Sequence, residues 1–87
     1  MNEPISDVIR HTRAHRGLTQ AALAERLARV SGNWSVTRDQ VARWERGGRV
    51  PGVYWRQWIA IVLEVPPREL DWAARCARAV RLLEVSS

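Results

Sequence analysis

The sequence predicts an all-α domain of five helices, and three observations support this fold class. Apolar residues recur with the spacing of one helical face almost throughout the chain. No segment alternates apolar and polar residues with the two-residue period of a strand. Proline and glycine residues separate the periodic segments and mark helix boundaries. A chain of 87 residues has the length of one domain, so we expect residues 1–87 to form a single unit.

The first two helices are predicted over residues 4–16 and 20–29. Pro4 suits the first turn of a helix, and Gly17 follows the first helix where a C-terminal cap is expected. Thr19 precedes the second helix as an N-cap residue. Apolar residues at helical spacing give the two helices a common buried face, formed by Ile5, Val8, Ile9, Leu23, Leu27 and Val30.

The third helix is predicted to begin at Thr37 and to end before a Gly-Gly pair. Thr37 and Gln40 have the spacing of a capping box. Val41 and Trp44 lie three residues apart on one face, which we expect to be buried. The other face carries most of the remaining residues, namely Arg38, Asp39, Ala42, Arg43 and Arg46. The preceding segment SGNWS is small and polar around one tryptophan, which predicts a loop.

Two further helices are predicted over residues 53–63 and 67–84, separated by a Pro-Pro pair. The last helix is longer than a small domain needs. We therefore place the core at about residues 4–71 and a C-terminal extension at about 72–87, and expect a homodimer through the last two helices. The alternative is that the tail packs across its own first helix. The residues of the extension that we assign to a dimer or partner surface are Trp72, Val80 and Leu83.

The charge of the chain favours a polyanionic partner. All 14 basic residues are arginine, and the formal net charge is +5. An excess of this size in one small domain is typical of proteins that bind nucleic acid. The choice of arginine over lysine is weak evidence by itself, because a GC-rich genome also favours arginine.

Other classes of function find little support. No apolar run approaches the ~18 residues of a membrane span, and the start MNEPISD lacks the features of a signal peptide. We therefore expect a cytoplasmic, nucleoid-associated protein with no membrane partner. His11 and His15 are spaced to share a metal but have no third ligand, and the single Cys76 excludes an internal disulfide. No phosphate-binding loop or nucleophile–base motif is present, so we expect no enzyme activity, cofactor or small-molecule ligand.

Two segments together carry a family resemblance. GLTQAALAERL and VTRDQVARWERGGRVP resemble the lambda-repressor/Cro-like (xenobiotic-response-element type) helix-turn-helix family. Its pattern runs G-L-T-Q-x-x-L-A, then V-S-x-x-x-[IV]-S-x-W-E-x-G-x-R-x-P. The resemblance covers about residues 5–71 and implies a five-helix DNA-binding fold with the helix-turn-helix at the second and third helices. The chain departs from the family in a longer turn around RVSGNWS, and in this it is similar to actinobacterial members.

The resemblance implies a role for several residues of this chain. The third helix, about residues 37–46, would enter the major groove of double-stranded DNA. The residues placed at base edges are Arg38, Asp39, Gln40 and Arg43. The residues placed at the DNA backbone are Gln20, Thr37, Arg46 and Arg49. An ion pair between Arg13 and Glu45 would fix the third helix against the first.

Two of these assignments have alternatives, and so does the placement of Trp34. Asp39 would either accept a hydrogen bond from cytosine or orient a neighbouring arginine, and we favour the second role. Gln40 would contact adenine in competition with its capping-box role. Trp34, in the lengthened turn, either covers the thin core as a lid or is exposed and meets a partner, and we favour the lid.

The expected function is that of a sequence-specific double-stranded DNA-binding transcriptional regulator, acting as a repressor. The alternative is a protein-interaction module, such as an antitoxin or an adaptor, that binds a partner protein and DNA. Trp34 and the surplus apolar face of the last helix favour this alternative. Aromatic residues that stack on bases would instead favour single-stranded nucleic acid, but they lie on helices where packing is the default role. These are Tyr54, Trp55, Trp58 and Trp72.

Overall fold

The computed structural model describes the backbone of residues 4–86 and the side chains of residues 4–80, 82 and 83. The described residues form five helices and no strand, which confirms the all-α prediction. The helices are α1 (Ile5–His15), α2 (Gln20–Ser31), α3 (Arg38–Glu45), α4 (Val53–Leu63) and α5 (Pro67–Ser86). Within the described part of the chain, no helix combines the length and apolar character needed to cross a bilayer.

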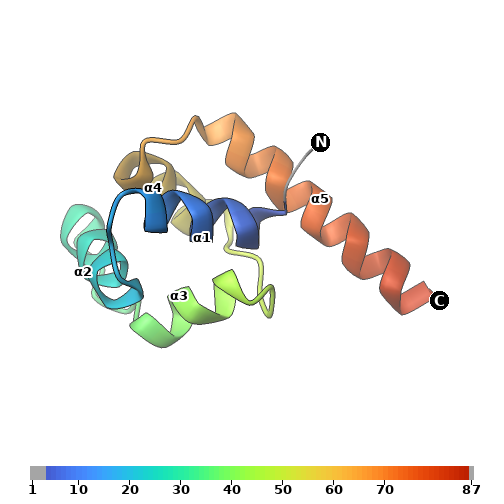
Figure 1. The fold of residues 1–87 in the computed structure, drawn as a ribbon, viewed down its shortest axis with the longest axis horizontal. Helices are drawn as coiled ribbons and strands as arrows, with labels where there is room; N and C mark the ends of the chain where they lie inside the picture. The colour runs from blue at the N-terminus through green and yellow to red at the C-terminus, as the bar shows by residue number, and fades with distance from the viewer. Residues whose placement is uncertain (1–3, 87) are drawn as a thin grey trace.

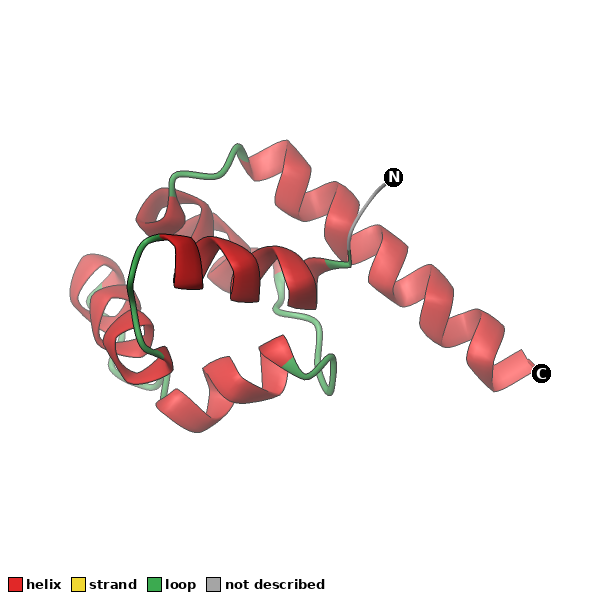
Figure 2. Ribbon diagram, viewed as in Figure 1, coloured by secondary structure: helices red, strands yellow, loops and turns green. Residues whose placement is uncertain are grey.

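The first four helices and the first half of α5 enclose one core, and the second half of α5 extends away from it (Figures 1 and 2). α1 packs against α3 and α5, α2 packs against α3 and α4, and α4 packs against α5. The extension makes the molecule elongated, with principal extents of 40 × 22 × 21 Å. The described side chains of α5 from Arg78 onward are exposed.

Local hydrogen bonds explain where the helices begin and end. Thr19 Oγ1 accepts the backbone N–H of Ala22 at 3.0 Å, and Thr37 Oγ1 accepts that of Gln40 at 3.2 Å. Each bond satisfies a donor that the first turn of a helix leaves unpaired. Gly17 follows α1 with a φ of +71°, a conformation that favours glycine. These caps lie where the sequence predicts them.

The end of α2 differs from the prediction. The helix continues to Ser31, two residues past Arg29, and stops at Gly32, which has a φ of +73°. The Gly32 N–H donates to the carbonyl of Ala28 at 2.9 Å, which is the last hydrogen bond of the helical i to i−4 series in α2. Part of the inserted segment is therefore helix, and residues 32–37 alone form the turn to α3.

Each of the five helices contributes side chains to the core. The prediction that Trp44 is a core residue is confirmed, because its side chain is 1% exposed. The prediction that Val30 is buried is wrong: it is 47% exposed, in the last turn of α2 beside a mostly exposed turn. The most deeply buried side chains of the five helices include Ile5, Ile9, Leu23, Leu27, Val41, Trp44, Ile59, Leu63 and Leu70.

Two arginines hold the helices together in a way the sequence does not predict. Arg56, 8% exposed, donates from Nη1 to the carbonyl of Pro51 at 2.9 Å and from Nε to Asp71 Oδ1 at 3.0 Å. Arg16 donates to the carbonyl of Leu63 at 3.0 Å and pairs with Glu64. Arg56 uses its charge inside the fold, whereas Arg16 is exposed and its charge is paired with that of Glu64 at the surface.

Candidate nucleic-acid interface

α3 lies at one edge of the domain, held from behind by α1 and α2 (Figure 1). Its buried side consists of Val41, Trp44 and Glu45. Helical spacing places Asp39 and Arg43 away from that side, and Arg38 is the first residue of the helix; all three are exposed. The arrangement presents one charged side of a short helix to the surroundings.

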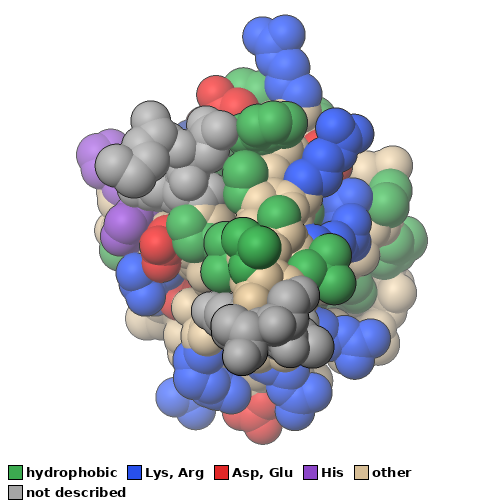
Figure 3. Space-filling model, turned by 90° about the vertical axis from the view of Figure 1, so that its right-hand side faces the viewer, with side chains coloured by type: hydrophobic (Ala, Val, Ile, Leu, Met, Phe, Trp, Pro, Cys, Tyr) green, Lys and Arg blue, Asp and Glu red, His purple; other side chains and the backbone are tan. Residues whose placement is uncertain are grey.

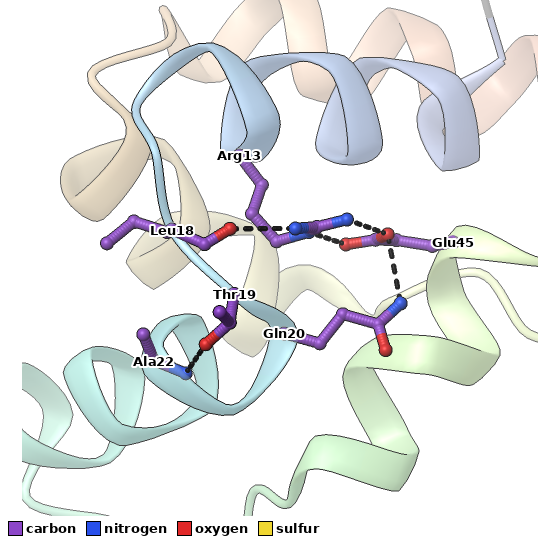
Figure 4. A network of polar contacts seen from close by, with 6 residues as sticks. All are labelled: Arg13, Leu18, Thr19, Gln20, Ala22 and Glu45. Carbon is purple, nitrogen blue, oxygen red and sulfur yellow. Dashed lines mark hydrogen bonds and ion pairs between the residues drawn. The ribbon is translucent and has the colours of Figure 1, made fainter.

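A polar network fixes α3 against the two helices behind it (Figure 4). Arg13 Nε donates to Glu45 Oε2 at 2.6 Å, and Arg13 Nη2 donates to Glu45 Oε1 at 2.9 Å. The third donor of Arg13, Nη1, bonds the carbonyl of Leu18 in the turn between α1 and α2 at 2.7 Å. Gln20, at the start of α2, donates from Nε2 to Glu45 Oε1 at 3.1 Å. One carboxylate therefore joins three helices.

The surroundings of this network favour the charged form of Arg13. The side chain of Glu45 is 3% exposed and that of Arg13 is 16% exposed. The hydrogen bond to Glu45, with its negative charge, raises the pKa of Arg13 above its ordinary value, against the opposing effect of burial. The negative charge of Glu45 is thus neutralised inside the fold, although it lies at the end of the helix that presents the arginines.

The residues predicted to contact base edges all lie on α3 and differ in exposure. Arg38, Asp39 and Arg43 are exposed on α3, whereas Gln40 is half-buried. Among the described residues, no ion pair joins Arg38 or Arg43 to an acidic side chain. Asp39 is the only acidic residue on this face of α3, and it lies in the first turn, where the helix dipole stabilises a negative charge.

Three of the four residues predicted to contact a DNA backbone are exposed, and the fourth takes part in the network of Glu45. Arg46 and Arg49 follow α3 and are exposed, with no ion pair to any described acidic residue. Thr37 is exposed, and its hydroxyl oxygen caps α3, which leaves its O–H free to donate elsewhere. Gln20 instead uses an N–H on Glu45, a role that the sequence does not predict.

The prediction that Trp34 covers the core as a lid is wrong, because its side chain is 65% exposed. Asn33 organises the turn: its Oδ1 accepts the N–H of Ser35 at 3.0 Å, and its Nδ2 donates to Tyr54 Oη at 3.4 Å. Val36, 5% exposed, closes the core at this point. Asparagine next to glycine is typical of such turns, so the sequence contained a signal for Asn33.

The predicted partner surface on α5 is exposed but divided between two faces. Trp72 is 51% exposed, Val80 50% and Leu83 70%. Helical spacing places Trp72 and Leu83 on one face, together with Cys76 and Ala79. Val80 lies nearer to α1. Hydrophobic side chains gather on the end of the molecule from which α5 projects, with basic side chains around them (Figure 3).

The described residues contain no group of three or more His, Cys, Asp or Glu that could hold a metal ion. Comparison of the chain with family models, with curated proteins and with solved structures finds no match.

Proposed function

We propose that this protein is a sequence-specific double-stranded DNA-binding regulator of the lambda-repressor-like helix-turn-helix class. One observation carries the proposal. Arg38 and Arg43 on α3, and Arg46 directly after it, are exposed without an acidic partner among the described residues, while the network of Glu45 anchors the helix to α1 and α2. A rigid helix with unpaired arginines suits the major groove, which is wide enough to admit an α-helix.

In this proposal α3 reads base edges with its first two turns. Arg38 and Arg43 each offer a planar guanidinium that can bond the O6 and N7 atoms of guanine, a contact worth about 1–3 kcal/mol of discrimination. Gln40 contacts adenine or stays in its half-buried place. Asp39 is one residue from Arg38 and orients that guanidinium rather than facing the phosphates, which would repel it.

Residues around α3 bind the sugar–phosphate backbone. Arg46 and Arg49 supply charge, and Thr37 supplies a hydroxyl. Gln20 retains one amide N–H beyond its bond to Glu45 for a phosphate oxygen. If one protomer neutralises about four to six phosphates, the slope of log affinity against log salt is about −4 to −5.

The protein acts as a repressor and as a homodimer in this proposal. Trp72, Cys76, Ala79 and Leu83 follow one another at intervals of four, three and four residues, which is the spacing of a helix–helix seam. Two α5 helices that pack along this face place two copies of α3 on neighbouring half-sites. Occupation of an operator that overlaps a promoter then blocks transcription.

The test is binding, by fluorescence anisotropy, to the DNA upstream of the protein's own gene and to a scrambled duplex of equal composition. At about 150 mM salt, where charges are screened beyond about 8 Å, we expect a preference of about a thousandfold or more. Equal, weak binding to both duplexes would leave only a general electrostatic attraction and contradict specific recognition on that DNA.

A second candidate is a protein-interaction module such as an antitoxin or an adaptor, with or without DNA binding. The exposed Trp34 favours it, because a large exposed aromatic side chain is typical of binding hot spots. The discriminating variant is Trp34→Ala. It should abolish capture of a co-encoded partner protein and leave the DNA affinity unchanged if the module is correct.

A further inference from the structure

A cavity of about 310 Å³ lies where α1 begins, where the loop after α3 passes, and where α5 leaves the core. The loop approaches α1 closely, since a Cβ atom on Gly47 would lie 3.9 Å from Ser6 Oγ. The cavity is lined by Pro4, Ile5, Ser6, Trp44, Arg46, Gly47, Arg49, Val50, Ala77 and Val80. Its volume is at the lower end of the range of about 300–1,000 Å³ for ligand pockets.

The cavity is lined by both apolar and positively charged side chains. Proline, isoleucine, tryptophan, valine and alanine side chains give it apolar walls, and Arg46 and Arg49 supply positive charge. Both arginines are exposed, and no described acidic side chain pairs with either. Val80 is half exposed, so the apolar wall of the cavity is open to the surroundings at this point. An occupant that matches this lining has apolar side chains and negative charge side by side.

A second copy of this chain does not match the cavity. Its projecting helix would be the segment to insert, and that helix carries the exposed Arg75 and Arg78 next to its apolar residues. Insertion would place these arginines close to Arg46 and Arg49, and like charges across an interface disfavour association.

We propose that the cavity binds an acidic segment of another protein. An apolar side chain of the segment enters between Val50, Ala77 and Val80, and its carboxylates pair with Arg46 and Arg49. The same two arginines hold DNA phosphates in the proposed function, and this step rests on that proposal. Because each guanidinium serves one anion at a time, the acidic segment and DNA exclude each other. The protein partner thereby releases the regulator from its operator.

The test is a selection against the intact protein from a phage-displayed library of random peptides of about twelve residues, enough for about three helical turns. We expect enriched peptides to combine large apolar residues with Asp or Glu. A synthetic copy of the strongest peptide should lose about tenfold or more in affinity for Val80→Glu. The matched control is Leu82→Glu, the same new charge on the same helix at a residue outside the cavity lining, which should change the affinity little.

Three results would overturn the proposal: no enrichment of acidic, apolar peptides, an equal loss of affinity for both variants, or displacement of the peptide by polyglutamate at equal carboxylate concentration. Competition with duplex DNA is measured separately. A peptide that binds at the cavity but does not displace DNA overturns the exclusion and leaves the proposed function intact. Failure of the protein to prefer any duplex overturns the proposed function, while the effect of Val80→Glu still decides whether the cavity binds the peptide.

Discussion

Arg13 of α1 and Glu45 of α3 meet through two parallel hydrogen bonds, of 2.6 Å and 2.9 Å, although they are 32 residues apart in the sequence. Glu45 belongs to the same short helix as Arg38 and Arg43. The orientation of the exposed arginines therefore depends on a part-buried ion pair that holds α3 against α1.

Removal of one partner of this pair should be costly. Arg13→Ala leaves the carboxylate of Glu45 buried without its charge partner, and we expect a loss of about 3–5 kcal/mol in the free energy of unfolding. Urea denaturation measures it. The matched control is Arg10→Ala on the same helix, where the exposed pair with Asp7 predicts a change below about 1 kcal/mol. Similar losses for both variants would contradict the structural role of the buried pair.

The pH dependence of this stabilisation has a definite sign. Folding raises the pKa of Arg13, chiefly through its hydrogen bond to Glu45. The contribution of Arg13 is therefore fully present below the ordinary pKa of arginine and is lost only as the pH rises through the higher folded value. We expect the difference in unfolding free energy between the wild type and Arg13→Lys to arise from the geometry of the two parallel guanidinium bonds rather than from titration. This difference should therefore stay constant between about pH 6 and pH 9.

The turn between α2 and α3 should depend on the backbone conformation of Gly32. Its φ of +73° is unfavourable for residues with a Cβ, although no atom would lie within 4 Å of that Cβ. Gly32→Ala should therefore lower the free energy of unfolding by about 1–2 kcal/mol through backbone strain alone. Gly32→Asn should lower it less, because asparagine tolerates this conformation. Equal losses in thermal denaturation would show that strain is not the cause.

Local sequence signals predicted some helix boundaries correctly and missed others. α4 spans Val53–Leu63 as predicted, because Gly52 and the Pro-Pro pair bracket a clear apolar pattern. The end of α2 was missed because the residues after Arg29 have the composition of a loop, and the sequence did not indicate that Gly32 ends the helix. Trp34 was misassigned because a hydrophobic side chain becomes buried only where the fold places an apolar surface next to it, and the sequence of the turn does not show whether such a surface is there.

The candidate site was predictable to a similar extent. Exposure of Asp39 and Arg43 followed from the helical period, since Val41 and Trp44 fix the buried side of α3. The roles of Arg16 and Arg56 did not follow, because their partners come from other helices and no short-range pattern records them. The cavity beside Arg46 and Arg49 depends on the packing of three distant segments.

Assembly should depend on the outward face of α5. Leu83→Glu places a charge on the proposed seam, and we expect the protein to sediment as a monomer at concentrations where the wild type is a dimer. Leu82→Glu is the matched control, because Leu82 lies on a different face of the same helix and is similarly exposed, at 69% against 70%. A monomeric wild type in sedimentation velocity would contradict the homodimer.

Arg49 should affect all DNA sequences alike. It lies in the loop after α3, outside the helix that the proposal places in the groove. Arg49→Ala should weaken binding to preferred and scrambled duplexes by the same factor and reduce the salt slope by about 1. Anisotropy titrations at several salt concentrations provide both quantities. A loss confined to the preferred duplex would instead assign Arg49 to base recognition.

The central claim, that α3 reads base edges, is tested most directly by selection from a pool of random duplexes with the wild type and with Arg38→Ala. We expect a defined motif for the wild type. For the variant we expect the same motif with the preference relaxed at one base position, equivalent to about 1–3 kcal/mol. An unchanged motif for Arg38→Ala, and likewise for Arg43→Ala, would contradict the placement of α3 in the major groove.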